Sequence, residues 1–291
     1  MVDILLALIT WTVRAQIVAL GLQTRIEDLL YLWRRPGLLL RSLLAMYVVV
    51  PIAAVLMVKI VPLPAPTTIA LLVLAISAGA PLVPRKLLEA GGDPPYVFSL
   101  AVCSSVLAIA TVPLSVEILG RLSGRDVGID PWSVAGVIGR TFLGPFFLGV
   151  VIRLLFQATA DRIASPFANL ASALFTVCAV LVIAFAFKLI LRAGLASFVA
   201  LGGLTLLALL IGHALGGPRP QDRLALGILC ASRHVGLAMV LAATVKNRAT
   251  VAAIGAYILA GLLVSIPYVR WARPRASPPE GTLQPGAATS S

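Results

Sequence analysis

The chain is built from apolar runs of membrane length that are separated by short polar connections. Sixty per cent of its 291 residues are apolar and only 12% are charged, whereas about a quarter of the residues in a soluble domain are charged. A bilayer core about 30 Å thick requires roughly 20 helical residues per span. The pattern predicts an all-α polytopic membrane protein with nine transmembrane helices, at residues 4–22, 38–60, 68–84, 96–119, 132–155, 166–190, 196–215, 224–245 and 251–270.

The net charge of +12 comes from basic residues at the edges of these runs, which argues against a nucleic-acid partner. Thirteen Lys and Arg residues lie on the connections of one side and in the segment after the ninth run, and seven lie on the other side. Cytoplasmic connections carry the excess of basic residues. We therefore expect the N-terminus to lie outside and the C-terminus in the cytoplasm.

The connections are too short to hold a soluble catalytic domain, the longest being residues 120–131. Residues 1–275 are predicted to form a single transmembrane transporter domain, and residues 276–291 a disordered cytoplasmic tail rich in Pro, Gly, Ser and Thr. No nucleophile–base pair or phosphate loop is present. The two histidines and three cysteines are scattered, which does not suit a metal site. We expect neither an enzyme nor a bound cofactor or metal.

Two of the runs are interrupted, the third at residues 77–86 and the eighth at residues 230–238. Pro81 and Pro84 each lack an amide hydrogen and push the preceding residue out of the α region. Backbone that is not helical is tolerated at membrane depth only where protein buries it or where it lines a cavity. The alternative is an ordinary proline kink, or simply the cytoplasmic end of a short third span. The broken-helix backbone is predicted at Gly79, Ala80, Pro81, Pro84, Cys230, Ala231 and Gly236.

Paired interruptions of this kind indicate a solute-binding site in transporters built from inverted repeats. The interrupted runs are the third and the eighth, so two inverted five-span repeats would fit if the first span of the first repeat were lost. The first repeat would then occupy about residues 1–120 and the second about residues 131–275. An odd number of spans per repeat inverts the second unit relative to the first.

The centre of the eighth run carries Ser232-Arg233-His234, which places a permanent charge about halfway through a span. Burying a guanidinium there costs at least about 2.5 kcal/mol, and every Asp and Glu of the chain lies in a connection, in a tail or near the end of a run. The remaining partners are backbone carbonyls, water in a cavity or an anionic ligand. We favour water and an anionic ligand together. The alternative is that Arg233 snorkels, or binds carbonyls as part of the scaffold.

Other polar residues within the runs are weaker candidates. His234 could relay protons, although a lone histidine in a helix bundle is more often a hydrogen-bonded core residue. Ser99 and Cys103 lie one helical turn apart and could line the same site, or could simply permit close packing. Arg14 and Arg140 are interpreted as structural, since their long side chains can reach an interface. The predicted substrate-binding residues are Arg233, His234, Ser232, Ser99 and Cys103.

Residues 20–58 resemble the opening of the bile acid/sodium symporter family. There a Gly-Leu ends one helix, an acidic connector follows, and an Arg-Pro step enters a helix with a central proline. These features stand here at Gly21-Leu22, Glu27-Asp28, Arg35-Pro36 and Pro51. Further short motifs follow in the order of the family, namely the Gly-Ala-Pro at 79–81, Gly92-Asp93, the helix at 99–113 and the Gly-Leu-Ala at 236–238.

The resemblance implies a panel domain and a core domain, with two broken helices that cross in the core and a solute carried by alternating access. It also implies nine or ten spans, an exoplasmic N-terminus in the nine-span form and organic anions as common substrates. We expect the protein to lie in a bacterial inner (plasma) membrane.

The chain departs from this family at the positions that bind sodium. Sodium-coupled members carry a Glu in the second crossing helix and a Gln-Asn pair four residues later; here these positions hold Leu229 and Arg233-His234. The polar Ser-Asn of the first crossing helix is replaced by apolar and basic residues near 82–86. In the fourth run Ser99 matches a hydroxyl ligand, but the expected Thr is Cys103.

These departures predict that the protein is not sodium-coupled in the usual way. A tethered guanidinium would permanently supply the charge that sodium supplies transiently, leaving a uniporter, an exchanger or proton coupling through His234. The sequence thus predicts a secondary active or facilitative transporter of small organic anions. The alternative is a non-transporting membrane scaffold or a subunit of an envelope complex. Nothing in the sequence indicates the oligomeric state.

Overall fold

The computed structural model describes residues 2–77, 87–88, 90–122, 132, 136, 138–191, 193–235, 238 and 248–273. Regular structure in these ranges is helical, apart from a single β-bridge at Arg233. The helices are α1 (Val2–Gln23), α2 (Ile26–Leu29), α3 (Pro36–Leu44), the π-helix η1 (Ala45–Val49), α4 (Val50–Ile60), α5 (Ala65–Ile76), α7 (Pro94–Leu122), the π-helix η2 (Gly139–Leu143), α9 (Gly144–Leu155), α10 (Gln157–Leu191), α11 (Leu195–Leu215), α12 (Pro220–Ala231) and α14 (Arg248–Ala272).

The prediction of an all-helical membrane protein is confirmed. Within the described ranges, four helical segments are long and apolar enough to cross a bilayer: Pro36–Ile60, Pro94–Ser115, Leu195–Leu215 and Ala249–Ala272. Large apolar side chains also stand exposed around the bundle, among them Leu154, Leu170 and Val199. A bilayer would remove that surface from water. The total of nine spans remains a prediction.

Prolines mark the starts of several helices. They occupy the first or second position of α3, α5 and α12, at Pro36, Pro66 and Pro220. The first amides of a helix have no partner inside it, so a proline costs nothing there and its fixed φ suits the helix. The starts of these helices are therefore encoded locally.

The start of the sixth run differs by nine residues from the sequence prediction. The sixth run is predicted to begin at residue 166, but α10 begins at Gln157, with only Phe156 outside the helical region between α9 and α10. Residues 157–165 include Gln157, Asp161 and Arg162 and therefore do not extend an apolar run, yet such a mixed sequence can be helical. Pro166 lies inside α10.

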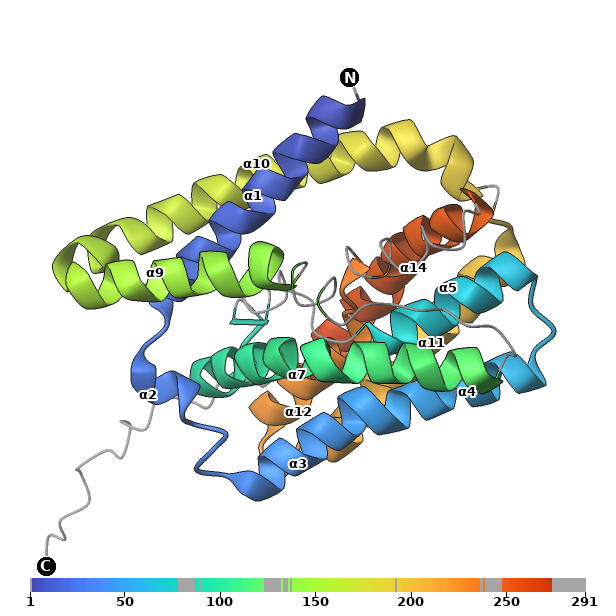
Figure 1. Ribbon diagram of the computed structural model, residues 1–291, viewed down its shortest axis with the longest axis horizontal. Coiled ribbons are helices and arrows are strands. Elements are labelled where there is room, and N and C mark those ends of the chain that lie inside the picture. Colours follow the sequence, from blue (N-terminus) through green and yellow to red (C-terminus); the bar gives the residue numbers. More distant parts are fainter. Residues whose placement is uncertain are drawn as a thin grey trace, which may run out of the picture.

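The described helices pack as two bundles (Figure 1). The small bundle consists of α1, η2, α9 and α10, and the large bundle consists of α3, η1, α4, α5, α7, α11, α12 and α14. A core around Met46, Leu74 and Leu209 lies mostly in the large bundle. A cluster around Phe146 joins α1 and α9 to α7, and a cluster around Ala164 joins α1 to α10. The bundles meet where α10 packs against α14 and where η2 packs against α7.

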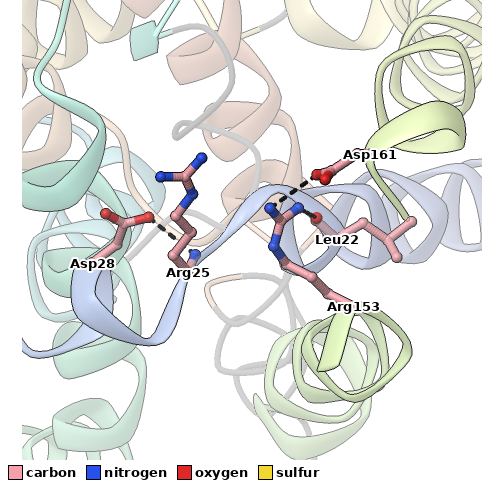
Figure 2. A network of polar contacts seen from close by, with 5 residues as sticks. All are labelled: Leu22, Arg25, Asp28, Arg153 and Asp161. Atoms are coloured by element: carbon pink, nitrogen blue, oxygen red, sulfur yellow. Dashed lines mark hydrogen bonds and ion pairs between the residues drawn. The ribbon is translucent and has the colours of Figure 1, made fainter. Parts of the chain in front are cut away.

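The small bundle is held by a close helix crossing and an ion pair. At the crossing of α1 and α9, a Cβ atom on Gly149 would overlap the carbonyl oxygen of Val18, so only glycine allows this approach. Near the end of α1, the Arg153 guanidinium donates to the Leu22 carbonyl at 2.6 Å and pairs with Asp161 of α10 at 2.9 Å (Figure 2). The guanidinium therefore ties all three helices together.

In the large bundle, α11 and α12 cross closely at Gly212 and Gly227. A Cβ atom on Gly212 would overlap the backbone of α12 at Leu226 and Gly227. Hydroxyl groups add ties between other elements, including Ser42 with Tyr96 at 2.8 Å and Thr67 with Ser197 at 2.6 Å. The glycine crossing sets how closely α12 approaches α11, and the hydroxyl pairs join α3 to α7 and α5 to α11.

Candidate functional site

The two interrupted segments meet in the structure. The first helix of the pair, α5, ends at Ile76, and the second, α12, ends at Ala231. The backbone amide of His234 donates to the carbonyl of Ser77 at 2.8 Å, so the ends of the two helices are joined through their backbones. Helical bonding then resumes beyond the eighth-run break, where the amide of Ala238 donates to the His234 carbonyl at 2.9 Å.

In the eighth run, Ser232 and Arg233 leave the helical conformation, whereas Cys230 and Ala231, predicted to lie in the break, are still helical. Ser232 is extended, with φ −89° and ψ 114°. In the third run, helix α5 stops just before the predicted segment. Gly79, Ala80, Pro81, Pro84 and Gly236 lie outside the described residues.

A tyrosine of α14 satisfies the backbone on both sides of the eighth-run break. The hydroxyl of Tyr257 donates to the carbonyl of Ala231, the last residue of α12, and accepts from the amide of Arg233 at 3.2 Å. Tyr257 is only 5% exposed. A buried amide or carbonyl without a partner is costly, so one hydroxyl stabilises two backbone groups that the end of the helix leaves unpaired.

The guanidinium of Arg233 is buried, with 3% of the residue exposed. Its Nη1 donates to the Met46 carbonyl of η1 at 3.4 Å, a long contact, and its Nη2 has no hydrogen-bond partner among the described residues. Among the described residues, the titratable side chains that act on its charge are Cys230, Tyr257 and Tyr47. None of these is a carboxylate, as the sequence predicted.

A cavity of about 500 Å³ lies beside this break. One end is formed by Ser232 and Arg233, and α14 supplies the polar hydroxyl groups of Tyr257 and Ser265. The opposite end reaches Arg270, about 20 Å further along α14 than Tyr257 at 1.5 Å per residue. Apolar side chains that line the rest of the cavity include Ile228, Ile258, Leu262 and Ile266.

The predicted site residues are only partly brought together. Ser232 and Arg233 line the cavity, whereas Ser99, Cys103 and His234 are not among the described residues that do so. The hydroxyl of Ser99 is fully buried, donates to the carbonyl of Leu29 at 2.9 Å and accepts from the amide of Leu32 at 3.2 Å. It thus joins α7 to the connector after α1.

Cys230 and Ala231 form the last turn of α12, directly before the break. Cys230 is fully buried and Ala231 lines the cavity. His234 is 7% exposed and takes part in the backbone contact with Ser77. Among the residues that the structure describes, no cluster of His, Cys, Asp or Glu could hold a metal ion.

Sequence reasoning missed the contributions of α14 and η1. Tyr257 and Ser265 lie inside an ordinary apolar run, and nothing in their spacing distinguishes them from packing residues. Met46 acts through its carbonyl, which its side chain does not reveal. The only local signal for η1 is Pro51, because a proline inside a helix disturbs the preceding turn.

A second buried polar group lies at the start of α12. Asp222 is 2% exposed, and its Oδ1 has no hydrogen-bond partner among the described residues. Burial, and next the nearby carboxylate of Asp93, raise the pKa of the Asp222 carboxyl above its ordinary value of 3.8, while Arg219 and Arg35 oppose the rise. This group is separate from the cavity beside Arg233, whose lining does not include it.

A model of the sodium bile acid symporter family matches residues 13–193, well over half of the chain. The match runs from α1 through α10 and includes the first interrupted segment. Arg233 and the cavity residues of α12 and α14 lie beyond its end. No individual curated protein sequence matches the chain.

Proposed function

The chain belongs to the sodium bile acid symporter family, and we propose that it carries a small organic anion across the membrane by alternating access, with Arg233 as the residue that recognises the charge. Membership makes it an integral membrane protein of a family of solute transporters. The proposal concerns the substrate class, the coupling and the residues that bind the solute.

The observation that carries the proposal is a buried guanidinium between two joined helix ends, beside a cavity and with no carboxylate partner in the described ranges. A buried cation is tolerated where it is paired or strongly hydrogen-bonded. One long bond to a carbonyl leaves part of the capacity of Arg233 unused, and a carboxylate or sulfonate can accept two parallel bonds from a guanidinium. The apolar walls around Leu262 suit a solute with an apolar body.

The coupling is proposed to be independent of sodium. Sodium binds several oxygen ligands, and the position of a family glutamate is held here by Leu229, which is buried and apolar. Four residues along, the break carries the cation of Arg233, and the hydroxyl of Tyr257 reaches it from α14. The fixed charge of Arg233 would take the place of the mobile sodium ion. The protein would then be a uniporter, an exchanger or a proton-coupled carrier that uses His234.

We also propose that the chain contains an inverted repeat. If the two repeats are related, α1 corresponds to α10, α3 to α4 together correspond to α11, α5 corresponds to α12 and α7 corresponds to α14. The meeting of α5 and α12 at their broken ends supports this pairing. We further propose a bacterial inner membrane, with the N-terminus outside, because the basic residues are biased toward one side.

The test uses the full-length protein. Thermal shifts in detergent over a panel of carboxylates and sulfonates, with taurocholate as the first compound, identify an anion that binds, because a ligand of the folded state raises the melting temperature. Uptake of that anion is then measured in proteoliposomes with and without a sodium gradient. We expect uptake without sodium, and an imposed pH gradient shows whether a proton drives it.

Arg233→Gln should weaken anion binding about 10- to 100-fold, the loss expected for charged hydrogen bonds. Arg140→Gln is the matched control, since Arg140 also lies in an apolar run but is exposed and bonds the Gly136 carbonyl of its own helix. Unchanged binding in Arg233→Gln, or uptake that requires sodium, would contradict the proposal. A flat response to the whole panel would favour a membrane protein without transport activity.

A further inference from the structure

Pro51 determines which backbone carbonyl is available to the Arg233 guanidinium. In η1 the turn is widened, and the amide of Val50 donates to the carbonyl of Ala45, five residues back. The next amide in this register would be that of residue 51, and its acceptor would be the carbonyl of Met46. Pro51 has no amide hydrogen. The Met46 carbonyl therefore lacks this helical donor, and it is the carbonyl that accepts from Arg233 at 3.4 Å.

We propose that Pro51 is a positioning residue for Arg233: it withholds a backbone donor from Met46, so that this buried carbonyl holds one nitrogen of the guanidinium. Met46 and Val50 are fully buried, which leaves the carbonyl few other partners. Single π turns are frequent at functional sites. The role of Pro51 in anion binding rests on the function proposed above, whereas its contact with Arg233 through Met46 does not.

The chain contains a matched π turn, followed by a proline, where no guanidinium of the described residues is recorded on the freed carbonyl. In η2 the amide of Gly144 donates to the carbonyl of Gly139, again five residues back, and Pro145 follows. In that register the carbonyl without a donor belongs to Arg140, on a helix of the small bundle. Replacing Pro145 therefore controls for the general effect of removing a proline from a helix.

Pro51→Ala supplies the missing amide. Whether the turn stays π or tightens to α, the Met46 carbonyl gains a backbone donor, from residue 51 in the first case and from Val50 in the second. The helix gains a bond because alanine has the amide hydrogen that proline lacks, and alanine also has the higher helix propensity. Arg233, however, would lose its acceptor. The stability gained from Pro51→Ala should therefore be smaller when Arg233 is present than when it is absent.

A double-mutant cycle measures this without any ligand. Melting temperatures in detergent are compared for Pro51→Ala in the native chain and in Arg233→Met, with Arg233→Leu as a second background if the first is poorly expressed. We expect the increase caused by Pro51→Ala to be about 2–4 °C larger in the variant that lacks the guanidinium. Pro145→Ala should give the same shift in both backgrounds. Equal shifts for Pro51→Ala in the two backgrounds would overturn the proposal.

Uptake of taurocholate into proteoliposomes supplies a readout that a purely structural role would not move. Pro51→Ala should raise the half-saturating concentration several-fold and leave the maximal rate within about twofold, the pattern of lost binding. Pro145→Ala should change neither quantity. An unchanged half-saturating concentration in Pro51→Ala would remove its role in anion binding. If the native protein takes up no taurocholate, the same comparison uses the anion that the thermal-shift panel identifies; if it takes up no anion of the panel, the proposed function fails, while the melting-temperature cycle still decides the contact.

Discussion

The backbone amide of His234 donates to the backbone carbonyl of Ser77 at 2.8 Å, joining two segments that lie more than half the chain apart in sequence. Ser77 is the first residue after α5, and His234 lies three residues after the end of α12. Both residues are buried. The bond therefore satisfies backbone groups that neither helix could satisfy by itself.

Removing this amide should destabilise the protein. His234→Pro deletes the donor and leaves the Ser77 carbonyl buried without that partner, at a cost of about 1–3 kcal/mol. His234→Ala keeps the amide and controls for loss of the imidazole. We expect the proline variant to melt clearly below the alanine variant in detergent. Equal melting temperatures for the two variants would mean that the bond contributes nothing.

Tyr257→Phe should destabilise the non-helical segment that follows α12. It removes the hydroxyl shared by Ala231 and Arg233 and leaves two buried backbone groups unpaired, which predicts a loss of roughly 2 kcal/mol or more. Tyr268→Phe is the control, because the Tyr268 hydroxyl bonds His213 at 3.0 Å, away from the break. Both variants should lower the melting temperature, but only Tyr257→Phe should weaken anion binding. An anion-induced thermal shift in Tyr257→Phe equal to that of the native protein would contradict this role.

Gly149→Ala should disrupt the small bundle. The added Cβ would overlap the carbonyl oxygen of Val18, and backbone atoms of α1 cannot move aside as a flexible side chain could. Overpacking of this kind costs about 1–3 kcal/mol. Gly139→Ala is the control, since a Cβ there meets nothing within 4 Å, and alanine is favoured over glycine in a helix. Thermal unfolding should show a decrease for the first variant and none for the second.

Asp222 makes the stability of the protein depend on pH. Its folded pKa lies above its ordinary value of 3.8 because of burial and Asp93, so the ionised form is disfavoured in the folded protein at neutral pH. That cost falls as the pH drops through the raised pKa toward 3.8. Asp222→Asn should therefore raise the melting temperature at pH 7.5, and the advantage should shrink at pH 5. A variant that is less stable than the native chain at pH 7.5 would contradict this sign.

The sequence determined the membrane class, the starts of several helices and the location of the eighth-run break. Long apolar runs can only be buried in lipid or in a core, and prolines at positions such as Pro36 and Pro220 fix helix starts by local geometry. The unpaired charge of Arg233 was also visible, because no acidic residue falls at the same depth. These features depend on spacing along the chain and need no knowledge of its path in space.

Only the tertiary structure decided which groups surround that charge. Ser99 and Cys103 share a helix face as predicted, but the Ser99 hydroxyl is used to hold the connector after α1. Tyr257 and the Met46 carbonyl reach Arg233 from α14 and η1 instead. Backbone carbonyls carry no signature in a sequence, and apolar runs of similar composition can pack in many orders. The partners of Arg233 were therefore fixed by how the helices pack.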